Sequence, residues 1–236
     1  MTHGRRVGSA SRVLTAERIA ITMLVLCGGA VLCKIVVAIV VLPDYAEAAL
    51  GAAVGIGSGL QTRSKALLQI SGLTFPVSLA LAFMGMGMWY ATVIRALTKL
   101  NIRGFSLQPG WVWGWIYLLF QLLFPLPTLE ATKSLWRGSR VVNSHDPSAD
   151  YRDLSAPPSI EVWWTLFNGG LWLSVYRGSL WNSVLPEFEL SDLGQPLHRL
   201  SLIALADPGG IALILAAAAA IWHVRAISAP LVEVGV

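Results

Sequence analysis

Three ionisable side chains lie in surroundings that are otherwise apolar, and they are the first candidates for chemistry. Lys34 lies inside the first long apolar stretch, Arg177 lies in the last third of the third stretch, and Asp207 directly precedes the last one. Charges inside a hydrocarbon layer are costly and commonly functional. If the three share one leaflet, they form a candidate ligand or ion-pair site that suits an anionic ligand or lipid headgroup. In the alternative, Lys34 and Arg177 extend separately to the membrane surface and Asp207 only caps a helix.

A second group of charges, Lys133, Arg137 and Arg140, follows a tryptophan-rich segment. These residues alternate with apolar ones from Leu129 onward, which predicts an amphipathic helix lying at the membrane interface. Clusters of Lys and Arg beside a membrane attract anionic lipids. We therefore expect lipid headgroups to bind at these three residues.

Other kinds of chemistry find little support in the sequence. No Ser/His/Asp arrangement and no pair of carboxylates shares a segment, so no catalytic residue is predicted. Cys27 and Cys33 do not form a CxxC pair, and the histidines are scattered over a tail, loops and a helix end: His3, His145, His198 and His223. We expect a protein without metal or cofactor that is not an enzyme. An intramembrane enzyme acting on lipid is a third hypothesis.

The composition is typical of a membrane protein. Of the 236 residues, 55% are hydrophobic and 13% are charged, whereas globular domains carry about 25% charged residues. The formal net charge is +4, but the basic residues flank apolar stretches instead of alternating with aromatic residues. We interpret them as an orientation signal and expect no nucleic-acid partner.

Four apolar stretches are long enough to cross a membrane as helices, since a span needs about 20 residues. They comprise residues 19–42, 73–94, 161–185 and 209–225. The last follows Asp207-Pro208, a favourable helix start. The sequence thus predicts an all-α membrane protein, a polytopic helical bundle with four firm spans and one Trp-rich segment that is re-entrant or Pro-kinked.

The remaining parts of the chain are expected to be short. Residues 1–18 form a cytoplasmic tail, residues 19–225 a single transmembrane helical domain, and residues 226–236 a short C-terminal tail that is disordered from Ser228. Residues 43–65 predict a loop of small residues. The first apolar stretch is too long for a cleaved signal peptide and is interrupted by Lys34.

The Trp-rich segment has two possible topologies. Residues 111–124 would form a helix of about 21 Å, which is shorter than the hydrocarbon core of about 30 Å. Pro125 and Pro127 then disfavour helix. The segment either enters the membrane and leaves on the same side, or it spans the membrane with a kink.

The distribution of basic residues favours the re-entrant alternative, because short cytoplasmic loops are enriched in Lys and Arg. If both ends of the segment are cytoplasmic, only Arg63, Lys65 and Arg199 lie outside. The cytoplasmic side then holds most of the others: Arg5, Arg6, Arg12, Arg18, Arg95, Lys99, Arg103, Lys133, Arg137, Arg140, Arg152 and Arg225. If the segment spans, the basic residues divide almost evenly. The same bias places the N-terminus in the cytoplasm.

Several motifs around this segment resemble a known family. They are Trp89-Tyr90 with Arg95-Ala96-Leu97, Pro109-Gly110-Trp111 with Gly114-Trp115, the prolines near 125–127, Leu135-Trp136-Arg137, and Trp163-Trp164. Through them, about a third of the chain is similar to the bacterial multi-pass membrane proteins catalogued as domain of unknown function 4328. The family usually has Asn where Ala96 stands, and a Pro and an Asn near Leu119 and Gln121. The resemblance implies the architecture and no known activity, and a function of those polar family residues would be missing here.

The leading functional hypothesis is an integral inner-membrane protein of a non-enzymatic, structural or interaction type. Its expected partners are the lipid bilayer, anionic lipids, and a membrane protein or a second copy of the chain. The alternative is a small-molecule or ion transporter that uses an outer-leaflet pocket formed by Lys34, Arg177 and Asp207.

Overall fold

The computed structural model describes residues 3–53, 58–110, 126–144, 151–184 and 208–235, and every regular element in these ranges is helical. Along the chain they are α1 (His3–Ala53), α2 (Ser58–Lys99), α5 (Leu126–Ser144), the short 3-10 helix η1 (Tyr151–Asp153), α6 (Ser159–Val184) and α8 (Pro208–Glu233). The prediction of an all-α fold is confirmed for this part of the chain.

Three of these helices contain a stretch that is long and apolar enough to cross a membrane: Ala10–Val37 in α1, Thr74–Lys99 in α2 and Gly209–Glu233 in α8. They correspond to the first, second and fourth predicted spans, so length and composition support a membrane protein. The third predicted span corresponds to α6, whose side chains are described only up to Ser174. Its crossing of the membrane stays a prediction.

Helix α1 includes the residues expected to form an N-terminal tail. Val13, Ala16 and Ala20 are buried and recur at helical spacing, so the apolar face of the first span continues toward the N-terminus. Arg18 between them is exposed, whereas Glu17 is half-buried. The segment is therefore a packed helical extension of the first span.

The loop expected over residues 43–65 is largely helical. Helix α1 continues to Ala53 and α2 begins at Ser58. Alanine is the strongest helix former, and residues 46–53 are mostly alanine. This propensity explains why a stretch of small residues that resembles a flexible loop extends both helices instead.

Helix α8 begins at Pro208, as predicted, but continues to Glu233 instead of ending near Arg225. Ile227 and Leu231 of this extension are fully buried, and they continue at helical spacing from the buried Val224. The hydroxyl of Ser228, also buried, accepts a hydrogen bond of 2.9 Å from the indole nitrogen of Trp89 on α2. The expectation of disorder from Ser228 is therefore wrong, because the apolar face of α8 extends through it.

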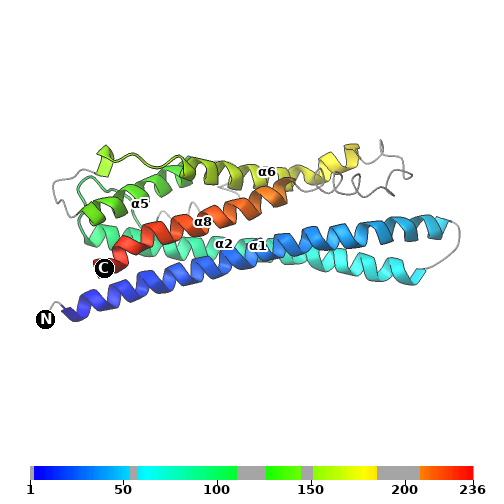
Figure 1. Ribbon diagram of the computed structural model, residues 1–236, viewed down its shortest axis with the longest axis horizontal. Coiled ribbons are helices and arrows are strands. Elements are labelled where there is room, and N and C mark those ends of the chain that lie inside the picture. Colours follow the sequence, from blue (N-terminus) through cyan, green and yellow to red (C-terminus); the bar gives the residue numbers. More distant parts are fainter. Residues whose placement is uncertain (1–2, 54–57, 111–125, 145–150, 185–207, 236) are drawn as a thin grey trace.

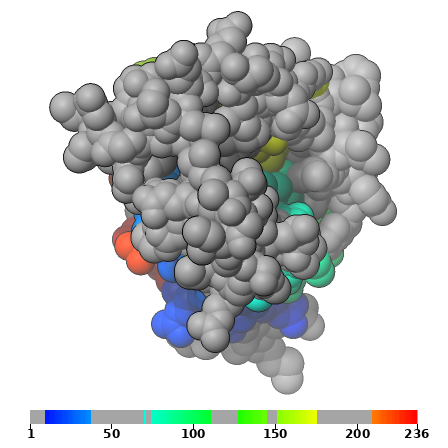
Figure 2. All heavy atoms as spheres, turned by 90° about the vertical axis from the view of Figure 1, so that its right-hand side faces the viewer, coloured from blue at the N-terminus to red at the C-terminus, as the bar shows by residue number. Residues whose placement is uncertain are grey.

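The helices form an elongated bundle in which α1 begins and α8 ends at the same end (Figure 1). Helix α1 packs against α2 on one side and α8 on the other, and α6 packs against α8. Figure 2 views the molecule from the opposite end, where α1, in blue, lies between α8, in orange, and α2, in cyan. Helix α5 lies against α2, α6 and α8 near the end that holds the start of α1.

Small residues let α6 and α8 approach closely at Gly170 and Gly209. A Cβ atom added at Gly209 would lie 2.8 Å from the carbonyl oxygen of Gly170, and one added at Gly170 would lie 2.9 Å from Cγ of Leu213. Close backbone approach between small residues is a common form of helix packing in membranes. These glycines fix α6 against α8 and so place the first turn of α6 beside α5.

Candidate functional site

Helix α5 runs from the middle of the bundle toward the end where α2 stops. Thr128, near its start, borders a cavity together with Phe83 and Met86, which lie halfway along the apolar stretch of α2. Gly138, farther along, packs on Leu97, since an added Cβ would lie 3.0 Å from Cδ1 of that leucine. Helix α5 therefore runs parallel to the last turns of α2.

This path differs from the predicted interfacial helix, because α5 is packed lengthwise into the bundle. Leu129, Leu135 and Trp136 are buried. Whether the preceding segment re-enters or spans the membrane stays a prediction. Phe105 contacts Tyr151 of η1, with ring centroids 6.0 Å apart, so the chain is at this end of the bundle before it reaches α5 at mid-depth. Residues 111–125 themselves lie outside the described residues.

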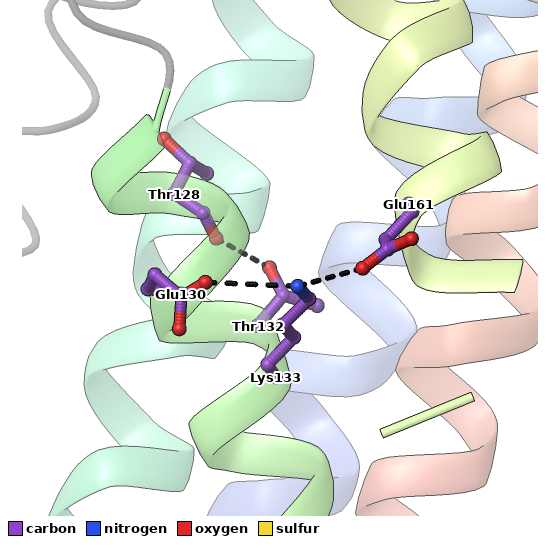
Figure 3. A network of polar contacts seen from close by, with 5 residues as sticks. All are labelled: Thr128, Glu130, Thr132, Lys133 and Glu161. Atoms are coloured by element: carbon purple, nitrogen blue, oxygen red, sulfur yellow. Dashed lines mark hydrogen bonds and ion pairs between the residues drawn. The ribbon is translucent and has the colours of Figure 1, made fainter. Parts of the chain in front are cut away.

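Lys133 connects α5 to the first turn of α6 (Figure 3). Its Nζ lies 2.8 Å from Oε1 of Glu161 and 3.6 Å from Oε1 of Glu130, one turn earlier on α5. The hydrogen bond that Lys133 donates to Glu161 is the main reason that the pKa of Lys133 is raised above its ordinary value of 10.5, and partial burial opposes the increase. Two carboxylates therefore surround the ammonium group of Lys133. Because Glu161 belongs to α6, its ion pair with Lys133 holds α5 and α6 together.

A chain of hydroxyl groups ties the same turn of α5 to α2. The hydroxyl of Thr132 donates to the carbonyl oxygen of Thr128 at 2.7 Å. Its oxygen is then left to accept a hydrogen bond from the hydroxyl of Tyr90 at 2.5 Å. Tyr90 and Thr132 are both buried, so the two bonds satisfy polar groups that water does not reach.

Arg137 and Arg140, the other two predicted headgroup ligands, have a different environment. The guanidinium carbon of Arg140 lies 4.5 Å from the ring centroid of Trp136. Trp136 in turn stacks on Trp222 of α8, with ring centroids 5.6 Å apart. The Nε of Arg137 is buried without a hydrogen-bond partner. Within the described residues, neither arginine forms an ion pair with a carboxylate, and Trp222 is 52% exposed.

His223, which the sequence predicts only at a helix end, is buried. Its Nε2 lies 3.2 Å from the carbonyl oxygen of Ser159, so this nitrogen carries the proton in the neutral ring. Three indole rings surround the imidazole, with the closest centroid, that of Trp222, at 4.8 Å: Trp136, Trp163 and Trp222. The Nδ1 is buried without a partner. The hydrogen bond and the ring contacts pack α8 against α6.

The predicted site of Lys34, Arg177 and Asp207 is described only in part. The Nζ of Lys34 lies 4.9 Å from the ring centroid of Phe75, at the far end of the apolar stretches from Lys99. Arg177 belongs to α6, but its side chain lies outside the described residues, as does the whole of Asp207. The pocket, and the transporter alternative that depends on it, stay predictions.

Metal ligands do not gather in the described part of the chain, where no group of three or more His, Cys, Asp or Glu residues lies together. Cys27 is buried, Cys33 is exposed, and neither forms a disulfide.

Comparison with protein-family models, with curated proteins and with solved structures finds no match to this chain. The resemblance drawn from the tryptophan and proline motifs therefore stays a prediction.

Proposed function

We propose that this chain is a multi-pass protein of the bacterial inner membrane with its N-terminus in the cytoplasm. Support for this orientation comes from one end of the bundle, formed by the start of α1, the end of α2, α5, η1 and the end of α8, which we call the basic end. Its described basic residues outnumber the acidic ones: Arg12, Arg18, Arg95, Lys99, Arg103, Lys133, Arg137, Arg140, Arg152 and Arg225. Basic residues mark the cytoplasmic side of a membrane protein.

In this proposal α6 is the fourth span. Its 26 residues correspond to about 39 Å of helix, enough to cross a hydrocarbon core of about 30 Å. The segment before α5 enters from the cytoplasmic side and returns through α5. This is also the layout that membership of the family named above would imply.

The proposed role is non-enzymatic and consists of association with lipid and with other membrane proteins. Large apolar side chains are exposed on the outer faces of several helices, as lipid or a partner helix requires: Val25, Leu32, Met84, Val162, Ile211 and Leu215. At the basic end, Arg137 and Arg140 bind the phosphate of an anionic lipid headgroup. Trp222 supports this assignment, because exposed tryptophan is enriched at the membrane interface.

The observation that carries the headgroup assignment is the difference between Lys133 and the two arginines. Lys133 has two carboxylate partners, whereas Arg137 and Arg140 have none among the described residues and Arg137 has a buried, unpartnered Nε. A partly buried guanidinium without a counterion among the described residues favours an external anion, and its planar fork matches phosphate. We therefore assign headgroup binding to Arg137 and Arg140 and not to Lys133.

Lipid retention tests this assignment. The protein is reconstituted into nanodiscs with equal phosphatidylglycerol and phosphatidylcholine and then extracted in mild detergent, and the lipid still bound is identified by mass spectrometry. We expect preferential retention of phosphatidylglycerol by the unaltered chain and loss of that preference in Arg137→Gln/Arg140→Gln. The matched control Arg95→Gln/Lys99→Gln removes the same charge from exposed residues at the same end. Equal retention by the two double variants would overturn the assignment.

A further inference from the structure

A cavity of about 70 Å³ lies where α1, α2, α6 and α8 meet, with the start of α5 at its edge. Leucine, alanine, phenylalanine and methionine make up most of its described lining. One of the few hydroxyl groups there, that of Tyr90, already bonds to Thr132. The described lining of the cavity therefore offers contact mainly to hydrocarbon.

The depth of the cavity decides what can reach it. Leu24 and Cys27 lie in the middle of the apolar stretch of α1, and Phe83 and Met86 lie in the middle of that of α2. In a membrane this level is the centre of the hydrocarbon layer. Water does not occupy a cavity with apolar walls, and a helix about 10 Å wide does not fit. Acyl chains are the material that surrounds the protein at this depth.

The pairs of helices around the cavity differ in how closely they pack. Glycines bring two of the helix pairs into close contact: an added Cβ at Gly85 would lie 3.0 Å from Met23 of α1, and one at Gly170 would lie 2.9 Å from Leu213 of α8. Between α2 and α6, the described contact is made by two aromatic rings, Phe83 and Phe167, with centroids 5.5 Å apart. Rings can rotate, whereas tightly packed backbones cannot separate without moving whole helices.

We propose that this cavity binds the hydrocarbon chain of a membrane phospholipid, which enters between α2 and α6 beside Phe83 and Phe167. An unfilled apolar cavity lacks dispersion contacts on one side. A chain from the adjacent layer restores these contacts without removing any group from water. This site is distinct from the headgroup site at Arg137 and Arg140. Its assignment rests on the proposed placement of the chain in a membrane and not on those arginines.

Photolabelling tests the proposal with the full chain in nanodiscs of phosphatidylcholine that contain a fraction of a phosphatidylcholine with a diazirine in its acyl chain. After irradiation, mass spectrometry locates the labelled residues. We expect label on cavity residues such as Phe167 and Leu213 as well as on the outward-facing Val25 and Leu215. In Ala216→Phe, which fills the cavity, label in the cavity is lost while label on the outer faces persists.

Controls separate the site from general contact with lipid. Leu215→Phe adds bulk to the neighbouring outward face, where Leu215 is 53% exposed, and leaves cavity labelling intact. If Ala216→Phe does not fold, Ala82→Leu, which narrows the cavity from the α2 side, should likewise abolish label in the cavity. Label confined to the outer faces of the unaltered chain overturns the proposal. So does cavity label by a small aromatic diazirine but not by the lipid, because the occupant is then not a lipid chain.

Discussion

Lys133 on α5 and Glu161 on α6 form an ion pair with 2.8 Å between Nζ and Oε1. The two residues are far apart in the sequence and belong to helices on either side of η1. Their contact joins helix α5 to the start of α6 (Figure 3). The same turn of α5 is bound to α2 through Thr132 and Tyr90. Polar contacts thus join α5 to two other helices, and each contact can be tested separately.

The first prediction concerns the strength of the ion pair. Glu161 is 59% exposed, so the interaction is screened by solvent, and Lys133→Met or Glu161→Gln should each cost about 1 kcal/mol or less. The double variant should cost less than the sum of the two, because both single changes remove the same interaction. Thermal unfolding in a fixed detergent measures all four proteins. Strict additivity would mean that the pair contributes no interaction energy.

The pH dependence of this pair has a defined sign. The pKa of Lys133 in the folded protein is raised above 10.5 by the hydrogen bond with Glu161. The pair therefore stabilises the folded state fully at pH values below the pKa of Lys133 in the unfolded chain. This stabilisation is lost as the pH rises through the pKa of Lys133 in the folded chain. The difference in stability between the unaltered chain and Lys133→Met should stay constant from neutral pH to about 10 and shrink only above 10.5. A difference that disappears near neutral pH would contradict this assignment.

The hydroxyl chain predicts an asymmetry between two conservative substitutions. Tyr90→Phe removes one donor and leaves Thr132 bonded to Thr128, so it should cost about 1 kcal/mol. Thr132→Val leaves the buried Tyr90 hydroxyl without its acceptor and should cost about 1–3 kcal/mol. Denaturant unfolding of the two variants compares these costs. A larger loss for Tyr90→Phe would reverse the donor order assigned above.

The crossing of α6 and α8 predicts opposite effects at two adjacent glycines. In Gly170→Ala the new methyl group lies 2.9 Å from Cγ of Leu213 and 3.0 Å from the carbonyl oxygen of Gly209, and overpacking of this kind costs about 1–3 kcal/mol. Gly169→Ala meets nothing within 4 Å and should be neutral or stabilising by about 0.5–1 kcal/mol, because alanine favours helix. Both variants are compared by thermal unfolding. Equal effects at the two positions would mean that α6 does not face α8 through Gly170.

Much of the helical layout could be predicted from the sequence, because apolar length and helix-start residues are local signals. The start of α8 after Asp207 and the apolar stretches of α1 and α2 follow from them. The extension of α1 and α2 toward each other could not be predicted in this way, since small residues suit both a loop and a helix. Helix α8 extends past Arg225 because its buried face packs on other helices, which no single segment reveals.

The candidate sites were harder to predict, because they depend on contacts between segments. The sequence grouped Lys133 with Arg137 and Arg140 by spacing alone, but the partner that separates Lys133 from them, Glu161, is on another helix. The sequence did not indicate that His223 is buried, since the tryptophans around it come from three helices. The apolar cavity likewise exists only where four helices meet.

The central claim is that the basic end, including the end of α5, faces the cytoplasm. It is tested most directly by labelling intact cells with an impermeant maleimide. The protein carries Cys27→Ala and Cys33→Ala together with Ser144→Cys, at the exposed last residue of α5. Ser58→Cys, at the start of α2 and the opposite end of the bundle, is the matched control in the same background.

The proposed topology predicts that the Ser58→Cys protein is labelled in intact cells and that the Ser144→Cys protein is labelled only after the cells are opened. Labelling of the Ser144→Cys protein from outside would contradict the proposed topology. The basic end would then not be cytoplasmic at α5, and the preceding segment would span the membrane.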